Sequence, residues 1–261
     1  MDALAANDIE QITADNHGAY TLSGTNTWLV GRGPCYVVDP GPFMEAHLTR
    51  VLSDAHDRGG IGGIAITHDH LDHVEAAAEL RRRAGGVPVA AARYEGADVR
   101  LGDGDRFGPL RAIATPGHAA DHLAFVAGGA CFSGDAVLGE GSVFVYPDPG
   151  ALRGYLSALR RLRVLGIRVI CPGHGPVVLD AAGKLDEYIA HRMERERRLV
   201  EALDAGLRTA DELLDRAWSD APAALRPAAT VTLAAHLDKL DEEDRLPVGV
   251  ERPQLSLLGE P

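Results

Sequence analysis

The stretch Gly63-Ile64-Ala65-Ile66-Thr67-His68-Asp69-His70-Leu71-Asp72-His73 decides the fold of this chain. It begins as a short apolar run, which is typical of a buried strand, and then changes abruptly to histidine and aspartate. Imidazoles and carboxylates at this density are the ligands of Zn²⁺ or a similar transition metal. The stretch therefore predicts a strand that ends in a metal site, and the rest of the chain should supply further ligands.

Composition and charge exclude several classes of protein. The chain has 261 residues, of which 46% are hydrophobic and 25% charged, as in a globular protein with one large domain or a domain plus a small one. It has no apolar run of membrane-spanning length and no signal peptide, so we expect a cytoplasmic protein without a membrane partner. The net charge of −12 argues against duplex DNA as a partner. The three cysteines lie in separate apolar runs and are expected to be buried thiols.

An apolar strand that stops at a glycine-flanked histidine or aspartate recurs along the chain. Predicted strands over 110–115, 130–132 and 167–171 lead into Pro116-Gly117-His118, Ser133-Gly134-Asp135 and Pro172-Gly173-His174. An earlier strand ends at Asp39-Pro40-Gly41, where the local sequence alone favours a simple turn former. One histidine or one Gly-Asp pair means little, but this repetition is difficult to attribute to chance. The glycines permit tight turns, so the loops can crowd round one small object.

Hydrophobic periodicity predicts the other elements of the first half. Short runs separated by glycine and proline predict a β-meander over residues 18–22, 26–31 and 34–39. A period of 3.6 over 42–57 predicts a core-facing helix with His47 and His56 on its exposed flanks. A further amphipathic helix is expected over 152–162.

These motifs resemble those of the metallo-β-lactamase-fold hydrolase superfamily. Residues 67–73 match its His-x-His-x-Asp-His motif, and the other motifs follow in the family order at Asp39, His118, Asp135 and His174. The resemblance covers roughly residues 18–176. It implies an α/β (α+β) fold, an αββα sandwich over residues 1–180, with two divalent metal ions, usually zinc, at one edge between the sheets.

The resemblance also implies a role for each motif residue. One metal would be held by His68, His70 and His118, the other by Asp72, His73 and His174, with Asp135 bridging both. A hydroxide shared by the two ions would be the nucleophile. The predicted catalytic residues are Asp72 and Asp39, of which Asp39 supports the histidine-bearing loop.

Three residues beside the motifs have less definite roles. Asp69 lies between predicted ligands and is expected to act outside the ligand set. Asp121 and His122 follow His118 closely, and they are either substrate-binding residues or surface loop residues.

The tail resembles that of the lactamase-β-like protein 2 branch, which is winged-helix-like. Over residues 181–261 we expect a long helix, a helix capped by Thr209 and Glu212, a helix over 223–241 and a small wing over 245–250. Winged helices often bind DNA, but the would-be recognition helix ends in the acidic run 238–244, whose carboxylates repel phosphates. We therefore expect a cap that forms one wall of the active-site cleft.

Two classes of substrate follow from the resemblance. The first is a small ester, thioester or lactone, as in the glyoxalase-II-related branches, and the alternative is single-stranded RNA cut by a metal-dependent endoribonuclease. The alternative needs a basic groove, and the candidate side chains, which could equally be solvated helix faces, are Arg160, Arg161, Arg163, Arg192, Arg195, Arg197 and Arg198. A non-catalytic scaffold is disfavoured because every ligand is present. β-Lactamase activity is also disfavoured, because no glutathione-type or antibiotic-type specificity loop is recognisable.

Overall fold

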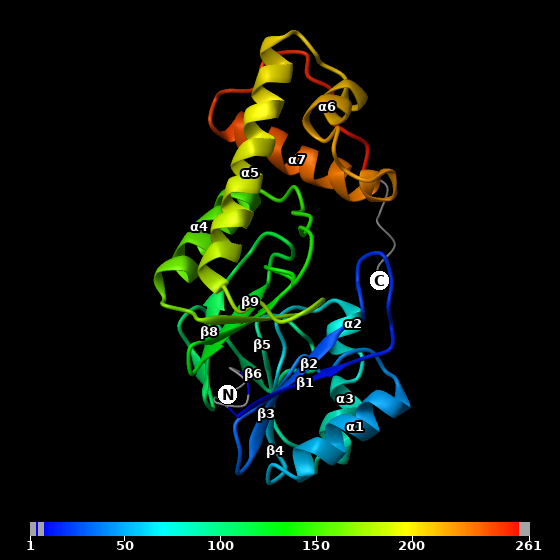
Figure 1. Ribbon diagram of the computed structural model, residues 1–261, viewed down its shortest axis with the longest axis vertical. Helices are drawn as coiled ribbons and strands as arrows, with labels where there is room; N and C mark the ends of the chain where they lie inside the picture. Colours follow the sequence, from blue (N-terminus) through cyan, green and yellow to red (C-terminus); the bar gives the residue numbers. More distant parts are fainter. Residues whose placement is uncertain (1–3, 5–7, 256–261) are drawn as a thin grey trace.

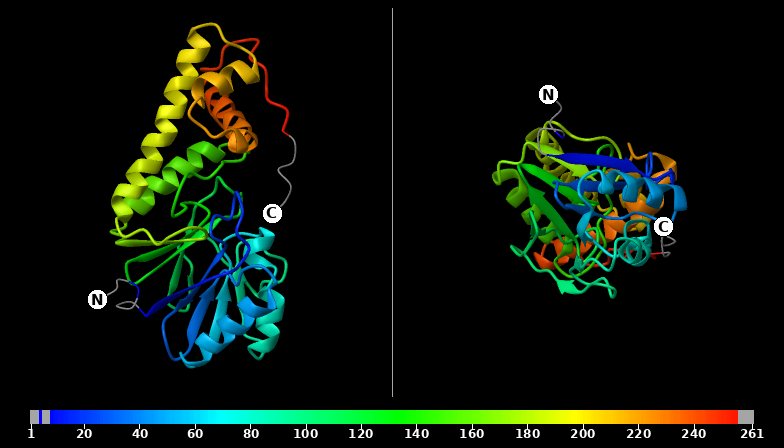
Figure 2. Two further views of the ribbon diagram at one scale, coloured as in Figure 1. Left: turned by 45° about the vertical axis from the view of Figure 1, so that its right-hand side comes forward. Right: turned by 90° about the horizontal axis from the view of Figure 1, so that it is seen from below.

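A computed structural model describes residue 4 and residues 8–255 of the chain. Residues 1–3, 5–7 and 256–261, at the ends of the two predicted domains, lie outside the described part. The N-terminal part is a sandwich of two sheets, and the C-terminal part is a small helical unit stacked on one end of it (Figures 1 and 2). No helix of the described residues is both long enough and apolar enough to cross a bilayer.

Each sheet of the sandwich has strands from one half of the N-terminal part. The first sheet has the order β1 (Ile9–Thr13), β2 (Asn26–Val30), β3 (Cys35–Val38), β4 (Ile61–Ala65), β5 (Val89–Ala91), β6 (Val99–Arg100). The second has the order β11 (Val169–Pro172), β10 (Ala130–Gly134), β9 (Leu123–Ala127), β8 (Leu110–Ala114), β7 (Arg106–Phe107). Strands β3 to β6 are parallel, as are β10 and β11, and the other neighbours are antiparallel.

Strand alternation divides the apolar side chains among three layers of core. In β2, Trp28 and Val30 point between the sheets, whereas Leu29 points to the outer face. Helices α1 (Glu45–His56), α2 (Leu71–Val74) and α3 (Ala77–Arg83) contribute to the outer core of the first sheet. Helix α4 (Ala151–Val164) and the start of α5 (Ala181–Asp204) cover the second. The predicted αββα sandwich is therefore confirmed, as is the burial of all three cysteines as free thiols.

The C-terminal part has a core of its own. It is formed by the second half of α5, by α6 (Ala210–Ala217) and by α7 (Arg226–Glu242). The 3-10 helix η2 (Ala223–Leu225) precedes α7 and has no buried residue. The predicted capping box is present, because Thr209 accepts from the backbone of Glu212 and Glu212 accepts from that of Thr209. Helix α5 belongs to both cores, with Tyr188 packed in the core of α4 and Leu203 in that of α6 and α7. The predicted boundary at residue 180 thus precedes a helix that both parts share.

Three local predictions are wrong. Residues 18–22 form a turn closed by a bridge between Gly18 and Leu22, and the first strand is β1, an edge strand whose polar residues weaken its hydrophobic pattern. Residues 245–250 contain no strand, so the described residues have no β-wing. His47 is only 6% exposed, because its Nε2 lies 2.8 Å from the Thr27 hydroxyl in the interior. His56, on the other flank of α1, is exposed as predicted.

Candidate metal centre

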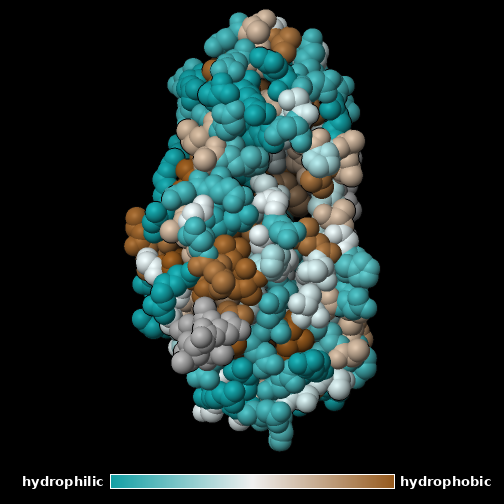
Figure 3. Space-filling view, viewed as in Figure 1, coloured by the Kyte–Doolittle hydropathy of each residue, from teal (hydrophilic) through white to brown (hydrophobic). Residues whose placement is uncertain are grey.

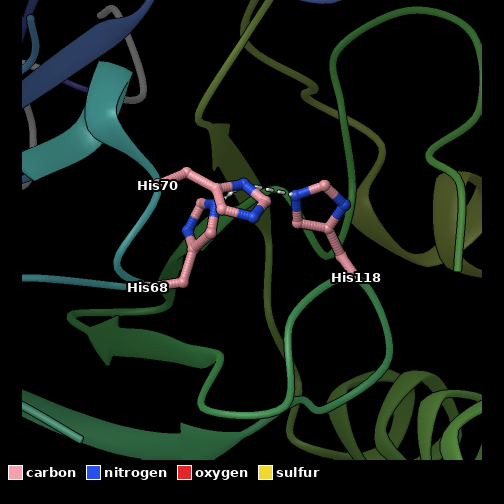
Figure 4. A group of neighbouring side chains, drawn as sticks. All are labelled: His68, His70 and His118. Carbon is pink, nitrogen blue, oxygen red and sulfur yellow. Dashed lines mark hydrogen bonds between the residues drawn. The ribbon is translucent and has the colours of Figure 1, made fainter. Parts of the chain in front are cut away.

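All seven predicted ligands meet at one edge of the sandwich. His68 and His70 lie on the loop after β4, and Asp72 and His73 lie in α2, which this loop enters. The other three follow strands of the second sheet: His118 after β8, Asp135 after β10 and His174 after β11. Figure 4 shows the rings of His68 and His70, from one segment, converging with that of His118 from another loop.

The first group of side chains consists of His68, His70 and His118. The Nδ1 atom of His70 lies 3.1 Å from the Nε2 atom of His68 and 3.1 Å from that of His118. The Thr67 hydroxyl donates to Asp39, so it accepts from Nδ1–H of His68, 2.9 Å away. Nδ1 of His118 lies 3.4 Å from the Phe144 carbonyl oxygen and is also a donor. Both Nε2 atoms therefore direct lone pairs toward Nδ1 of His70.

The second group consists of Asp72, His73 and His174. Nε2 of His174 lies 3.2 Å from Oδ2 of Asp72 and 3.3 Å from Nε2 of His73. The other nitrogen of each ring is a donor, from His73 to Asp39 at 2.8 Å and from His174 to the Gly24 carbonyl oxygen at 3.3 Å. Two neutral rings held in this way point their lone pairs at each other, which is unfavourable unless a cation lies between them.

Asp135 faces both groups. Its Oδ2 lies 3.7 Å from Nε2 of His118 and 3.4 Å from Nε2 of His174, and its Oδ1 lies 3.6 Å from Nε2 of His73. This Oδ1 is buried and has no hydrogen-bond partner among the residues that the structure describes. Buried carboxylate oxygens are normally paired or coordinate a metal. The position of Asp135 fits a ligand that serves both groups.

The pKa values show that the second group attracts positive charge. Burial alone would lower the pKa of His73 and His174, but nearby carboxylates, chiefly Asp72 and Asp135, raise them to about 9 and about 11. Burial would likewise raise the pKa of Asp72, yet His73 and His174 lower it to about 2. In the first group, burial lowers the pKa of His118 to about 4, and neighbouring histidines add to the effect. A divalent metal such as Zn²⁺ could supply this positive charge in place of the protons, because it binds ionised carboxylates and deprotonated imidazole nitrogens.

The residues present therefore fit two divalent metal ions. Within each of three groups, one ligand atom per residue lies within 4.8 Å of the others: His68, His70 and His118; His68, His73 and Asp135; Asp72, His73 and His174. Two glycines allow the loops to approach so closely. A Cβ on Gly134 would lie 2.6 Å from the Thr67 hydroxyl, and one on Gly173 would lie 2.5 Å from Oδ1 of Asp135.

Asp39 lies behind the centre and not in it. Its carboxylate accepts from the backbone N–H of Thr67 at 2.8 Å, from the Thr67 hydroxyl at 2.7 Å and from Nδ1 of His73 at 2.8 Å. It is buried and has a φ of 50°, a strained value for a residue other than glycine. Predicted as a catalytic residue, Asp39 is better described as a positioning residue that orients His68 through Thr67 and His73 directly.

The two candidate substrate contacts do not reach the open space above the centre. His122 is 1% exposed, its Nδ1 lies 2.7 Å from the Thr115 hydroxyl, and its Nε2 accepts from the backbone N–H of Asp135 at 3.1 Å. This corrects the expectation of a substrate contact, because both ring nitrogens serve the protein and His122 positions Asp135. Asp121 is half-buried and does not line the cavity, and burial and the charge of Asp69 raise its pKa. Asp69 itself is exposed.

A cavity of about 280 Å³ lies over the metal centre. His70, Asp72, His118, Asp135 and His174 line its floor, and its roof is mainly apolar, with contributions from four segments: residues 19–22, 138–146, 191–195 and 218–232. In Figure 3, this face of the molecule is hollowed between the two parts, with apolar residues around the hollow. The expectation that the tail walls the cleft agrees with this lining.

Sequence reasoning missed the aromatic residues of this cavity. Tyr20, Phe144, Tyr146 and Trp218 all line it, and the Phe144 ring packs against His118 with ring centroids 4.9 Å apart. Tyr20, Phe144 and Tyr146 lie in loops without hydrophobic periodicity, and Trp218 directly follows α6, so no local sequence pattern places them at the cavity.

Comparison with known proteins agrees with the fold. Residues 20–101 and 96–174 match the family described as the metallo-beta-lactamase superfamily, and residues 209–247 match the beta-lactamase associated winged helix domain. The chain thus belongs to the metallo-β-lactamase superfamily of hydrolases, in a form with a C-terminal winged-helix domain. Within it, the chain is similar to the beta-lactamase-like protein 2 homolog of Caenorhabditis elegans, with 35% identity over 89% of this chain and 83% of the relative.

Two further relatives define the extent of the likeness. Thioesterase pkgB of Emericella nidulans is 34% identical over 72% of this chain and 56% of its own length. A beta-lactamase domain protein from Burkholderia ambifaria has a similar structure, with a TM-score of 0.74, 20% identity and coverage of 93% of this chain and 89% of that protein. The structural likeness extends across both parts of the molecule.

Proposed function

We propose that this protein is a dinuclear-metal-dependent hydrolase of small esters, thioesters or lactones, and that both metals are zinc. The observation that carries the proposal is the position of the His/Asp centre on the floor of a small, mainly apolar cavity. A cavity of about 280 Å³ suits a short acyl group better than a polymer. Metal ions bound there would lower the pKa of water toward neutrality and stabilise negative charge on a substrate oxygen.

The protein's own residues prepare the site for this chemistry. Asp39 and Thr67 hold His68 and His73 in the tautomer that leaves Nε2 free for a metal. The backbone of Asp135, held by His122, keeps its carboxylate between the two groups. The Phe144 ring packs against His118 of the first group and against Tyr146, and these apolar rings would limit the access of water to that ligand.

One relative supports a thioester in particular. The fungal protein that is similar over 72% of this chain is named a thioesterase. A thioester has a polarised carbonyl carbon and a good leaving group, so water activated by bound metal ions would be sufficient to convert it to a carboxylic acid and a free thiol. We therefore rank thioesters first among the three acyl classes.

The arginines support an acyl substrate over single-stranded RNA. Arg192 and Arg195 are 2% and 6% exposed, so they offer no open basic groove. On α4, Arg161 pairs with Asp103 and Arg163 pairs with Asp186. Helix α7, the would-be recognition helix, is buried along most of its length, which also argues against duplex DNA.

The test is an assay of purified, metal-quantified protein on acyl thioesters of N-acetylcysteamine, matched oxygen esters, γ-lactones and end-labelled single-stranded RNA. We expect turnover of an acyl substrate that is abolished by chelation and restored by added zinc. His70→Ala should abolish turnover, whereas His56→Ala, a matched change of an exposed histidine on α1, should not. Turnover that survives chelation, or RNA cleavage without acyl turnover, would overturn the proposal.

A further inference from the structure

Arg192 is a buried guanidinium in the wall of the cavity. It lies on α5, is 2% exposed and lines the cavity above the metal centre. Its terminal Nη2 donates to the Ser142 hydroxyl at 3.1 Å and to the Val143 carbonyl oxygen. Its guanidinium carbon lies 5.6 Å from the ring centroid of Tyr155. These contacts hold the side chain in one place without neutralising its charge.

No carboxylate of the described residues lies within 4.0 Å of Arg192, and its buried Nε–H has no hydrogen-bond acceptor there. The neighbouring arginines of α5 differ, because Arg195 and Arg198 both pair with Asp220, at 2.5 Å and 3.1 Å. Buried charges in proteins are normally paired, since removing an ion from water costs several kcal/mol. Arg192 is therefore a charge in the cavity wall for which residue 4 and residues 8–255 supply no counter-charge within ion-pair distance.

A short segment connects Arg192 to the metal centre. The Val143 carbonyl oxygen accepts from Arg192, and the carbonyl oxygen of the next residue, Phe144, accepts from His118 at 3.4 Å. Consecutive Cα atoms are only about 3.8 Å apart. A small molecule in the cavity can therefore contact the first group of histidines and the guanidinium region together.

We propose that Arg192 recognises a carboxylate on the acyl part of the substrate, so that the enzyme hydrolyses mono-thioesters or mono-esters of short dicarboxylic acids. This inference rests on the proposed function and refines it. A carboxylate fits better than a phosphate, because Nη2 already has two acceptors and because Glu140 and Asp220 also line the cavity. The single positive charge of the Arg192 guanidinium matches the single negative charge of a carboxylate.

The experiment compares matched substrates that differ only in the remote group: the mono-thioesters of succinic, glutaric and adipic acids and the same thioesters with that carboxylate as a primary amide. Charge-assisted hydrogen bonds in a dry site predict a KM about 10- to 100-fold lower for the acid of the best-fitting length. Arg192→Met should remove this preference by raising KM for the acid alone, and Arg192→Lys should keep part of it. Arg160→Met, on the exposed face of α4, is the matched control and should leave KM unchanged for both the acid and the amide.

A direct binding measurement separates this inference from the proposed function. Trp218 lines the cavity, so its fluorescence should report the binding of glutarate and of glutarate monoamide to the metal-loaded protein. If the protein binds glutarate more tightly than the monoamide and Arg192→Met abolishes this preference, the carboxylate site is supported. The absence of thioester turnover in the same protein would then overturn only the hydrolase proposal. Equal losses for acid and amide in Arg192→Met would mean that Arg192 only holds the 142–143 loop. That outcome, or no preference in the unaltered protein, overturns the inference.

Discussion

The floor and the roof of the cavity are built on opposite principles. On the floor, each histidine of the second group uses one ring nitrogen for a protein acceptor and leaves the other free. The roof holds none of the predicted metal ligands and consists mainly of apolar side chains from a turn, a loop and the C-terminal part. Chemistry that needs fixed lone pairs requires the first arrangement, whereas selection of a substrate by shape needs only the second. Changes to the floor should therefore alter rate, and changes to the roof should alter selectivity.

The largest effect should come from Asp135→Asn, which keeps the shape of the side chain and removes its charge. Asp135 lies between the two groups, so its loss should disturb both at once. We expect kcat to fall by about a thousandfold or more. Steady-state kinetics together with metal analysis would check this, with Asp57→Asn at an exposed site as control. A variant with bound metal and nearly full kcat would show that the floor does not act as one unit.

Asp39→Asn should have a smaller effect on the floor. The change weakens the charged acceptor for Nδ1 of His73, so that its free Nε2 is a poorer ligand. We expect the affinity for metal to fall by about 10- to 100-fold, with substrate KM little changed at saturating zinc. Competition with a chromophoric chelator measures the affinity. An unchanged affinity would contradict the positioning role of Asp39.

Leu225→Ala tests the roof. This side chain lies in η2, is half-buried and lines the cavity. We expect KM for the best acyl substrate to rise by about fivefold to tenfold, because apolar contact is lost, while metal content stays the same. Inductively coupled plasma analysis and kinetics of the same preparation would test both parts. Loss of metal in this variant would mean that floor and roof are not separable.

The smallest effect concerns the acid stability of the C-terminal part. His236 is fully buried against Trp218, and burial together with Arg192, Lys239, His191 and Arg195 holds its pKa well below 6.5. The folded state therefore keeps this ring neutral while the unfolded state binds a proton below pH 6.5, so stability present above pH 6.5 is lost as pH falls. At pH 6 this loss is on the order of 1 kcal/mol relative to pH 8.

His236→Leu should remove that part of the pH dependence. The free energy of unfolding in urea should be measured at pH 8 and at pH 6. Its decrease between pH 8 and pH 6 should be smaller in the variant than in the unaltered protein. The matched change His56→Leu at an exposed site should leave the difference unchanged. If His236→Leu also leaves it unchanged, the ring is not held neutral by the fold.

The floor could be predicted from sequence and the roof could not, for a physical reason. Each floor residue follows a strand, and a strand has a strong period-2 or all-apolar pattern, so residues such as His174 could be placed in three dimensions from their position in the chain. Residues of the roof, such as Tyr20 and Phe144, lie on segments without periodicity, and only tertiary packing brings them together. His122 was misplaced because a histidine in a loop has the same local sequence whether it faces solvent or supports a neighbour's backbone.

The same limit applies to the fold. The αββα sandwich followed from the motifs, but edge strand β1 was missed because its Glu10 and Gln11 dilute the apolar pattern. The C-terminal helices were predicted correctly from their caps and apolar spacing. The predicted wing is wrong, because residues 245–250 form no strand. Arg192 carried no sequence signal of burial, since an arginine run on a helix usually faces water.

The length of helix α5 sets the distance between the floor and the roof of the cavity. Its 24 residues form one continuous helix of roughly 36 Å that is anchored in both cores, so it fixes the height and the orientation of the roof above the floor. Inserting a single residue in its middle would turn the C-terminal part by about 100° and destroy the cavity, whereas inserting seven would raise the roof by about 10 Å with nearly the same facing. Deeper pockets for longer acyl chains are thus accessible by adding whole pairs of helical turns, without any change to the metal centre.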